Sequence, residues 1–254
     1  MPSAQNMSSA SVPAKLSLTI YTETIQFLLQ NNALQMAEQA LSKLLLCSDD
    51  GRSVSYLFFL AQWQLLRTEY ENAADTLKEI LSHGSQDADV WALNGHCQYL
   101  LKAFSKSVKS YEQSLDLFPL PSDIHFVLLR LGSIYFQEKQ YERAKDVYLR
   151  ACRHTPSCLT WLGLGMACYK LEKLDEAESA LNEATNFNFQ NAEMWGYLCQ
   201  ISLRCGREEE AKQAYHFATK VSQIGGVIRK DELCSSTNLS SLFTKFISTS
   251  FFLK

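Results

Sequence analysis

The chain has 254 residues, of which 46% are hydrophobic and 20% are charged. These fractions are typical of a folded protein, and the length suits one elongated domain or two small globular ones. The formal net charge is −3 and the chain has no block of lysine and arginine, so a nucleic-acid partner is not expected. No apolar run approaches the roughly 18 residues of a membrane-spanning helix, so a membrane partner is not expected either.

The eight cysteines indicate a reducing compartment rather than a disulfide scaffold. They form no C-x-x-C pair, and most of them fall within predicted helices. Cys97, Cys168 and Cys199 stand near predicted helix crossings, where a small apolar side chain packs well. The N-terminal stretch MPSAQNMSSASVPAK contains neither the basic nor the apolar region of a secretory signal. A cytoplasmic location is therefore predicted.

The N-terminal part of the chain changes character at about Lys15. Residues 1–14 are polar and rich in serine, alanine and proline, and they are predicted to be disordered. A helical period follows over about 15–48, with Ala37 and Leu41 among its key positions. Asn31-Asn32 supplies the tight turn between the two helices of this first unit.

The same pattern then recurs along the chain. Ala73 and Ser107 occupy the same place in successive units, and so do Ser107 and Ala144. The second of these intervals is longer than the first, which places a three-residue insertion around Leu120–Ser122. The five further units are expected over about 53–85, 87–119, 124–156, 159–189 and 192–221, within an array spanning 15–220.

The fourth unit shows the pattern most clearly. Its stretch from Leu128 to Pro156 has the spacing of a tetratricopeptide (TPR) repeat, a pair of antiparallel helices about 34 residues long. Gly132 lets the two helices approach closely, Tyr148 fills the space between turns, and Pro156 ends the second helix. The sequence therefore predicts an all-α fold, a TPR helical-hairpin solenoid that forms a right-handed superhelix of about six repeats.

The repeat pattern stops after Val221. Gly225-Gly226 is expected to break the last helix, and residues 222–254 form an irregular tail rich in serine and phenylalanine. A solenoid needs an end cap, because its last repeat otherwise exposes its stacking surface. Two alternatives stay open: the tail is disordered, or it is a partial cap through its apolar residues Leu242, Phe243, Phe246, Phe251 and Phe252.

The sequence contains no recognisable catalytic, phosphate-binding or metal-binding motif. The five histidines are scattered, and the chain has no Gly-rich phosphate loop and no G-x-S-x-G or H-E-x-x-H motif. The cysteines also lack zinc-ligand spacing. No catalytic residue, cofactor or metal site is therefore predicted, and the chain is not expected to be an enzyme.

A protein-binding groove is the remaining candidate site. In a TPR array the first helices of successive repeats line such a groove, and the repeat register selects the residues that face it. These residues are Phe58, Gln62, His96, Tyr99, Leu129, Ser133, Phe136, Met166 and Tyr169. Tyr99, Phe136 and Tyr169 would form an aromatic stripe that contacts a partner peptide or helix. The alternative is that these rings pack between helices, as aromatic residues at helical spacing usually do.

The last two units carry a narrower resemblance. The segments WLGLGMACYKLEKLDEAESALNEAT (161–185) and NAEMWGYLCQISLRCGREEEAKQAY (191–215) resemble the C-terminal TPR region of cilia- and flagella-associated TPR proteins. The resemblance implies a scaffold in the assembly or dynein-driven motility of the axoneme, with axonemal or dynein-arm partners. It also implies a short isoform or a fragment of a longer protein. After about Lys220 the chain departs from the family, where a further amphipathic helix would be expected.

Three other functions fit the same repeats. A generic cytosolic adaptor, for instance in a ubiquitin-ligase or trafficking complex, would have the same physical pattern. A chaperone co-factor is disfavoured because the Lys and Asn residues of a two-carboxylate clamp are missing from the first helices. An RNA-binding helical repeat is disfavoured because there is no basic stripe. The sequence leaves the partner's identity and the oligomeric state open.

Overall fold

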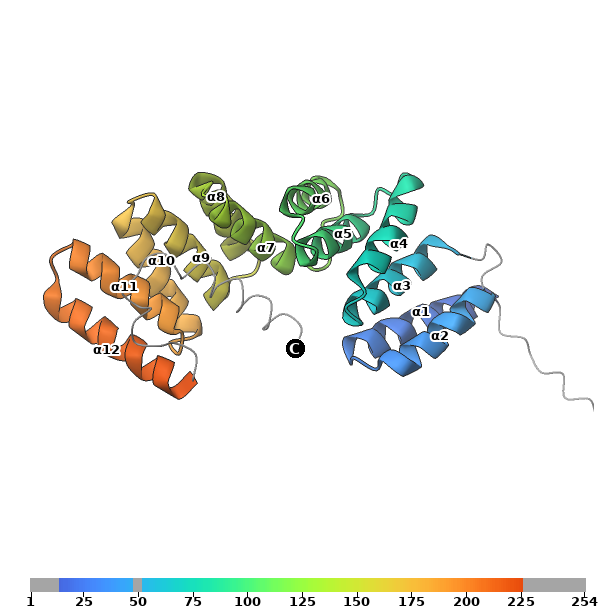
Figure 1. Ribbon diagram of the computed structural model, residues 1–254, viewed down its shortest axis with the longest axis horizontal. Coiled ribbons are helices and arrows are strands. Elements are labelled where there is room, and N and C mark those ends of the chain that lie inside the picture. Colours follow the sequence, from blue (N-terminus) through green and yellow to red (C-terminus); the bar gives the residue numbers. More distant parts are fainter. Residues whose placement is uncertain (1–13, 48–51, 226–254) are drawn as a thin grey trace, which may run out of the picture. The chain divides into compact units, whose positions relative to one another are not determined.

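The computed structural model describes residues 14–47 and 52–225. These residues form twelve α-helices and no β-strand, and consecutive helices pair as antiparallel hairpins (Figure 1). The predicted all-α TPR fold is confirmed. The predictions for residues 1–13, for the loop at 48–51 and for residues 226–254 lie outside the described residues. The right-handed superhelix stays a prediction.

The chain divides into two compact units between Ser122 and Asp123, where the three-residue insertion was predicted. Asp89 holds the end of the first unit, because its Oδ1 accepts hydrogen bonds from the Ser122 backbone N–H (2.7 Å) and hydroxyl (3.0 Å). The first unit contains α1 (Ala14–Gln30), α2 (Leu34–Cys47), α3 (Val54–Leu66), α4 (Tyr70–Ser82), α5 (Ala88–Leu100) and α6 (Phe104–Asp116). The second unit contains α7 (Ile124–Gln137), α8 (Tyr141–His154), α9 (Cys158–Lys170), α10 (Leu174–Phe187), α11 (Ala192–Arg204) and α12 (Glu208–Gly225).

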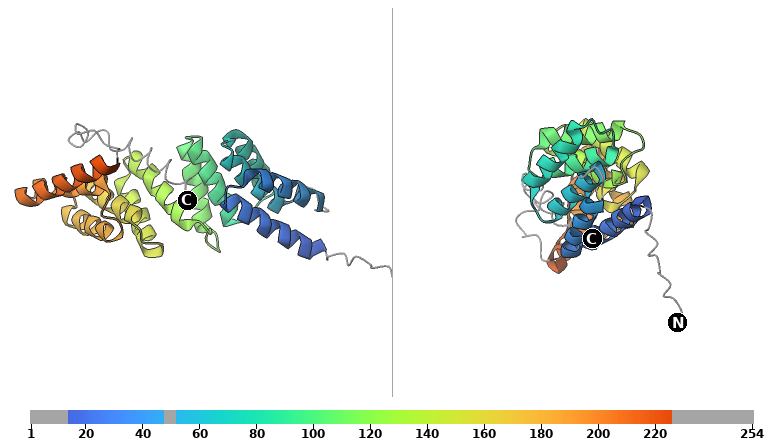
Figure 2. Two further views of the ribbon diagram at one scale, coloured as in Figure 1. Left: turned by 90° about the horizontal axis from the view of Figure 1, so that it is seen from below. Right: turned by 90° about the vertical axis from the view of Figure 1, so that its right-hand side faces the viewer.

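Within each unit the helix pairs stack on their neighbours. In the second unit α8 packs on α9 and α10 on α11, while the first helices α7, α9 and α11 also contact one another in turn. The first unit repeats this arrangement with α2 on α3, α4 on α5, and contacts from α3 to α1 and α5. Figure 2 shows the helices of each pair from two further directions. Each pair that is followed by another pair in its unit is therefore covered by the first helix of that next pair.

Small residues let the paired helices approach, as predicted for Gly132. A Cβ atom added at Gly132 would lie 2.8 Å from the ring of Tyr148, which is too close for any substituent without movement. The same pairing of a glycine on the first helix with a large side chain on the second occurs at Gly95 with Tyr111 and at Gly165 with Leu181. The large partners are fully buried, so these contacts form the core of each hairpin.

The turn inside each hairpin uses a left-handed residue that the sequence pattern did not reveal. The residue has a positive φ in all six pairs: Asn32 (54°), Thr68 (63°), Lys102 (60°), Lys139 (61°), Glu172 (60°) and Gly206 (74°). The backbone then closes onto the first helix, as in the third pair, where the N–H of Ala103 donates to the carbonyl of Gln98 at 2.9 Å. Glycine and asparagine suit such a position, whereas a β-branched residue is strained there.

Replacing Thr68 with glycine is expected to stabilise the first unit by about 1 kcal/mol, because glycine reaches a φ of 63° without the steric penalty of a β-branched side chain. Thr68 is exposed, so the substitution removes no packing. The free energy of unfolding from urea titration measures the effect. The matched control is Thr24→Gly within α1, which should give no gain, because glycine weakens a helix interior. Destabilisation by Thr68→Gly would contradict the assignment of strain.

Candidate protein-binding site

The residues of the predicted groove lie on the first helices of four pairs, divided between the two units. Phe58 and Gln62 lie on α3, His96 and Tyr99 on α5, Leu129, Ser133 and Phe136 on α7, and Met166 and Tyr169 on α9. Tyr99 therefore belongs to the first unit, and the other two aromatic rings of the stripe belong to the second. A single ligand contact by all three rings stays a prediction.

Most of these side chains are buried. Only Phe58 and Gln62 are half-buried, while the other seven are nearly enclosed. The aromatic rings find partners within their own units: Phe136 meets Tyr141 edge to face at 5.4 Å between ring centroids, and Tyr169 meets Tyr197 at the same distance. A ligand that touched these residues would reach only a small part of each ring.

His96 also takes part in the interior. Its Nδ1 lies 2.7 Å from the hydroxyl of Tyr111, the large side chain that packs on Gly95. This contact ties α5 to α6 and gives the histidine a structural role. The histidine is therefore poorly placed for acid–base chemistry at the surface.

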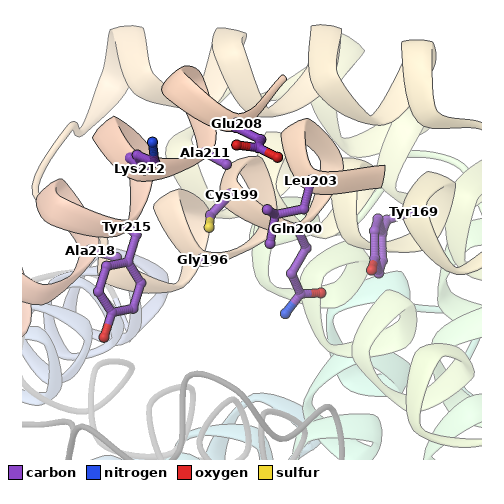
Figure 3. Close-up of a pocket in the computed structure, with 10 residues that line it drawn as sticks. All are labelled: Tyr169, Gly196, Cys199, Gln200, Leu203, Glu208, Ala211, Lys212, Tyr215 and Ala218. Carbon is purple, nitrogen blue, oxygen red and sulfur yellow. The ribbon is translucent and has the colours of Figure 1, made fainter. Parts of the chain in front are cut away.

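The second unit contains an open pocket that the repeat pattern did not indicate. Its volume is about 630 Å³. The helices α11 and α12 form most of its wall, and α9 adds one residue at the edge (Figure 3). The lining residues are Tyr169, Gly196, Cys199, Gln200, Leu203, Glu208, Ala211, Lys212, Tyr215 and Ala218.

The lining of this pocket is suited to an apolar partner. Figure 3 shows Tyr215 of α12 and Gln200 of α11 extending toward the same side, with Leu203 next to Gln200 and Tyr169 set apart at the edge. Glu208 and Lys212 supply one charge of each sign on α12. Gln200 and Leu203 occupy the register rows of the predicted groove. The repeat pattern gave no sign that these two residues are open to a ligand. They lie in the last pair, and among the described residues no further pair covers it.

No metal site accompanies this surface. Across the described ranges, no three His, Cys, Asp or Glu side chains come close enough together to hold a metal ion. Burial raises the pKa of the Cys97 and Cys168 thiols to about 11, which keeps them protonated and unreactive at neutral pH. None of the helices within 14–47 and 52–225 combines the length and apolar character that crossing a membrane requires.

One buried carboxyl group stands out near the start of α11. Asn191 caps this helix by accepting hydrogen bonds from the backbone N–H groups of Glu193 (3.0 Å) and Met194 (3.2 Å). The Oε1 of Glu193 is enclosed and has no hydrogen-bond partner among the described residues. Burial raises the pKa of Glu193 from its ordinary 4.5 to about 8. The folded protein therefore favours the protonated form of this side chain.

The pKa of Glu193 is higher in the folded protein than in the unfolded chain. Below about pH 4.5 the side chain is protonated in both states, and its burial then costs no ionisation energy. As the pH rises toward about 8 the unfolded chain ionises more readily, so the folded state loses stability. We expect Glu193→Gln to stabilise the second unit by about 2 kcal/mol or more at pH 8.5 and to have little effect at pH 4.5. Urea titrations at both pH values measure this difference. The exposed Glu183→Gln is the control, and an equal gain from both variants would contradict the burial argument.

A comparison with known families identifies the chain. The model of the cilia and flagella-associated protein 70 C-terminal domain, a TPR domain, matches residues 32–225. The chain belongs to this family. It is 43% identical over 203 residues to cilia- and flagella-associated protein 70 of Homo sapiens, and 51% identical over 117 residues to that of Macaca fascicularis. The human match covers 80% of this chain and 18% of the relative, and the macaque match covers 46% and 12%.

Solved structures show the same fold. PilF from Pseudomonas aeruginosa superposes with a TM-score of 0.69 over 93% of this chain and 99% of its own. Because the sequence identity is only 16%, this similarity is evidence of a shared fold alone. TPR domains mediate protein–protein interactions and are typically non-catalytic. The chain is thus a cilia- and flagella-associated TPR protein that spans less than one fifth of the length of its human relative.

Proposed function

We propose that this chain is a non-enzymatic scaffold of the motile cilium or flagellum, which holds axonemal or dynein-arm proteins in the assembly or regulation of motility. The observation that carries the proposal is the family match over residues 32–225, with 43% identity to a protein named for cilia and flagella. The location in the axoneme and the dynein-arm partners rest on this relationship.

The geometry supports a binding role. Stacked helix pairs present broad, rigid surfaces with little rearrangement, which suits a scaffold better than a catalyst. The pocket between α11 and α12 offers an apolar surface flanked by one acidic and one basic side chain. Such a surface fits an amphipathic helix, a common partner of a helix-lined groove.

Proximity labelling in ciliated cells tests the proposal. A biotin ligase fused to this chain should enrich axonemal or dynein-arm components several-fold over the same ligase fused to an unrelated TPR protein of similar size. Equal enrichment of these components by both fusions would overturn the ciliary role. Enrichment of a ubiquitin-ligase or trafficking complex instead would favour the generic adaptor.

Two surface variants then locate the contact. Phe58→Asp with Gln62→Lys alters the two half-buried residues of the predicted groove, and Leu203→Asp with Tyr215→Asp alters the pocket of the second unit. Loss of enrichment by the first variant alone would place the partner on the predicted groove. Loss by the second alone would place it on the pocket. Circular dichroism of both variants confirms that the helices persist.

A further inference from the structure

The pocket of the second unit is the stacking surface of the last helix pair. Comparison of residues at the same place in successive pairs shows this directly. Leu203 of α11 is 59% exposed, whereas Tyr169 of α9 is 7% exposed and Phe136 of α7 is 8% exposed. On the second helices, Tyr215 is 41% exposed, and its counterpart Tyr148 is 1% exposed. The pocket therefore lies where the earlier pairs receive another helix.

The contacts inside the unit show what covers these positions. The ring of Tyr169 is covered by Tyr197, which lies on the first helix of the next pair. Tyr148 is covered by Gly163, again on the next first helix, and a Cβ atom there would come within 2.4 Å of the ring. An occupant of the pocket should therefore be a helix with one apolar face, placed like a seventh first helix.

The chain carries a segment with this pattern. Its apolar residues follow the spacing i, i+3, i+4, i+7 and i+8, which puts them on one face of a helix. They are Leu239, Leu242, Phe243, Phe246 and Ile247. Ser241 and Ser248 fall on the opposite face, and Phe251 and Phe252 fall outside the apolar face. The family match ends at residue 225, so this segment lies beyond the matched repeats.

The connection between α12 and this segment is long enough. Residues 226–238 can span up to about 45 Å when extended, while the 18 residues of α12 rise by about 27 Å. The segment can therefore turn back along α12 and reach the pocket beside Tyr215. Tethering also gives it an effective concentration in the millimolar range, which a separate partner helix rarely reaches.

We propose that residues 239–247 of this chain form a helix that docks into the α11–α12 pocket and caps the repeat array. Leu242, Phe243 and Phe246 would contact Leu203 and Tyr215. These two residues are exposed, whereas the residues at the same register positions of earlier pairs are buried. The apolar stacking surface would then be closed within one molecule.

The cysteines of α11 and its end provide the test. Cys199 lines the pocket, and Cys205 is exposed just after the helix ends. The rate of N-ethylmaleimide labelling at each site can be followed by mass spectrometry of peptides from the intact chain. Phe243→Asp with Phe246→Asp should raise the rate at Cys199 about tenfold or more and leave Cys205 unchanged. Ser241→Asp with Ser248→Asp adds the same charge to the polar face and should behave as the unaltered chain.

A pocket-side variant gives an independent readout. Docking should protect Lys245 from trypsin, and Leu203→Asp should remove that protection. Cys199 rates equal in all forms, with Lys245 cut equally fast, would overturn the proposal and leave the pocket open for a partner. Protection that disappears on dilution together with a dimer mass would also overturn it, because the segment would then dock on a second copy.

Discussion

Replacing Tyr148 with alanine is expected to lower the free energy of unfolding of the second unit by about 3–5 kcal/mol. The ring is 1% exposed and is enclosed between two glycines, Gly132 of its own pair and Gly163 of the next. Because neither glycine has a side chain that could move into the space, the cavity would stay largely open. Urea denaturation followed by circular dichroism measures the loss, and hydrogen exchange of α8 and α9 locates it.

The chain offers a matched control for this prediction. Tyr215 occupies the same register position in the last pair but is 41% exposed. In a chain that also carries Phe243→Asp and Phe246→Asp, Tyr215→Ala should be destabilising by less than about 1.5 kcal/mol, because little buried surface is lost. Equal losses from the two alanine substitutions would contradict the view that the next first helix supplies the stabilising contact.

Replacing Gly163 with valine is expected to destabilise the second unit by about 3 kcal/mol or more. A Cβ atom at this position would lie 2.4 Å from the Tyr148 ring, and the ring has Gly132 behind it and cannot retreat. The loss is expected at the contact of α8 with α9, so the pairs on either side should separate more readily. Thermal and urea unfolding measure the change.

Combining the two substitutions separates overpacking from other effects. In the chain with both Tyr148→Ala and Gly163→Val, the new side chain can occupy the space that the ring leaves. The combined loss should therefore be smaller than the sum of the two single losses, with a coupling of about 1–3 kcal/mol. Additive losses would show that Gly163 is required for a reason other than the close approach of Tyr148.

Much of the fold could be predicted because TPR pairs are local structures. Gly132 and Tyr148 belong to the same hairpin, and the packing of a small residue against a large one leaves a periodic trace in the sequence. The same reasoning placed a three-residue insertion around Leu120–Ser122, and the two units meet in the sequence directly after it. It did not find the left-handed turn residues. Positions such as Thr68 and Lys102 have the same backbone conformation, but their side chains differ, so they leave no common residue type in the sequence.

The candidate site could be predicted only in part. The register placed Phe136 and Tyr169 at equivalent positions of α7 and α9, but it could not show that these rings are buried in the stack. Leu203 has the same register and is 59% exposed. A repeat pattern treats these positions as equal, whereas their accessibility depends on which helix lies beside them.

The sequence by itself determined the helical period, the pairing of neighbouring helices and the family, because each depends on residues within one or two repeats. Only the tertiary structure decided which positions are enclosed and which are open. Burial is a property of the stack, since α9 and α11 remove Tyr148 and Tyr169 from solvent. The absence of an equivalent helix after α12 among the described residues is what opens the pocket at Leu203 and Tyr215.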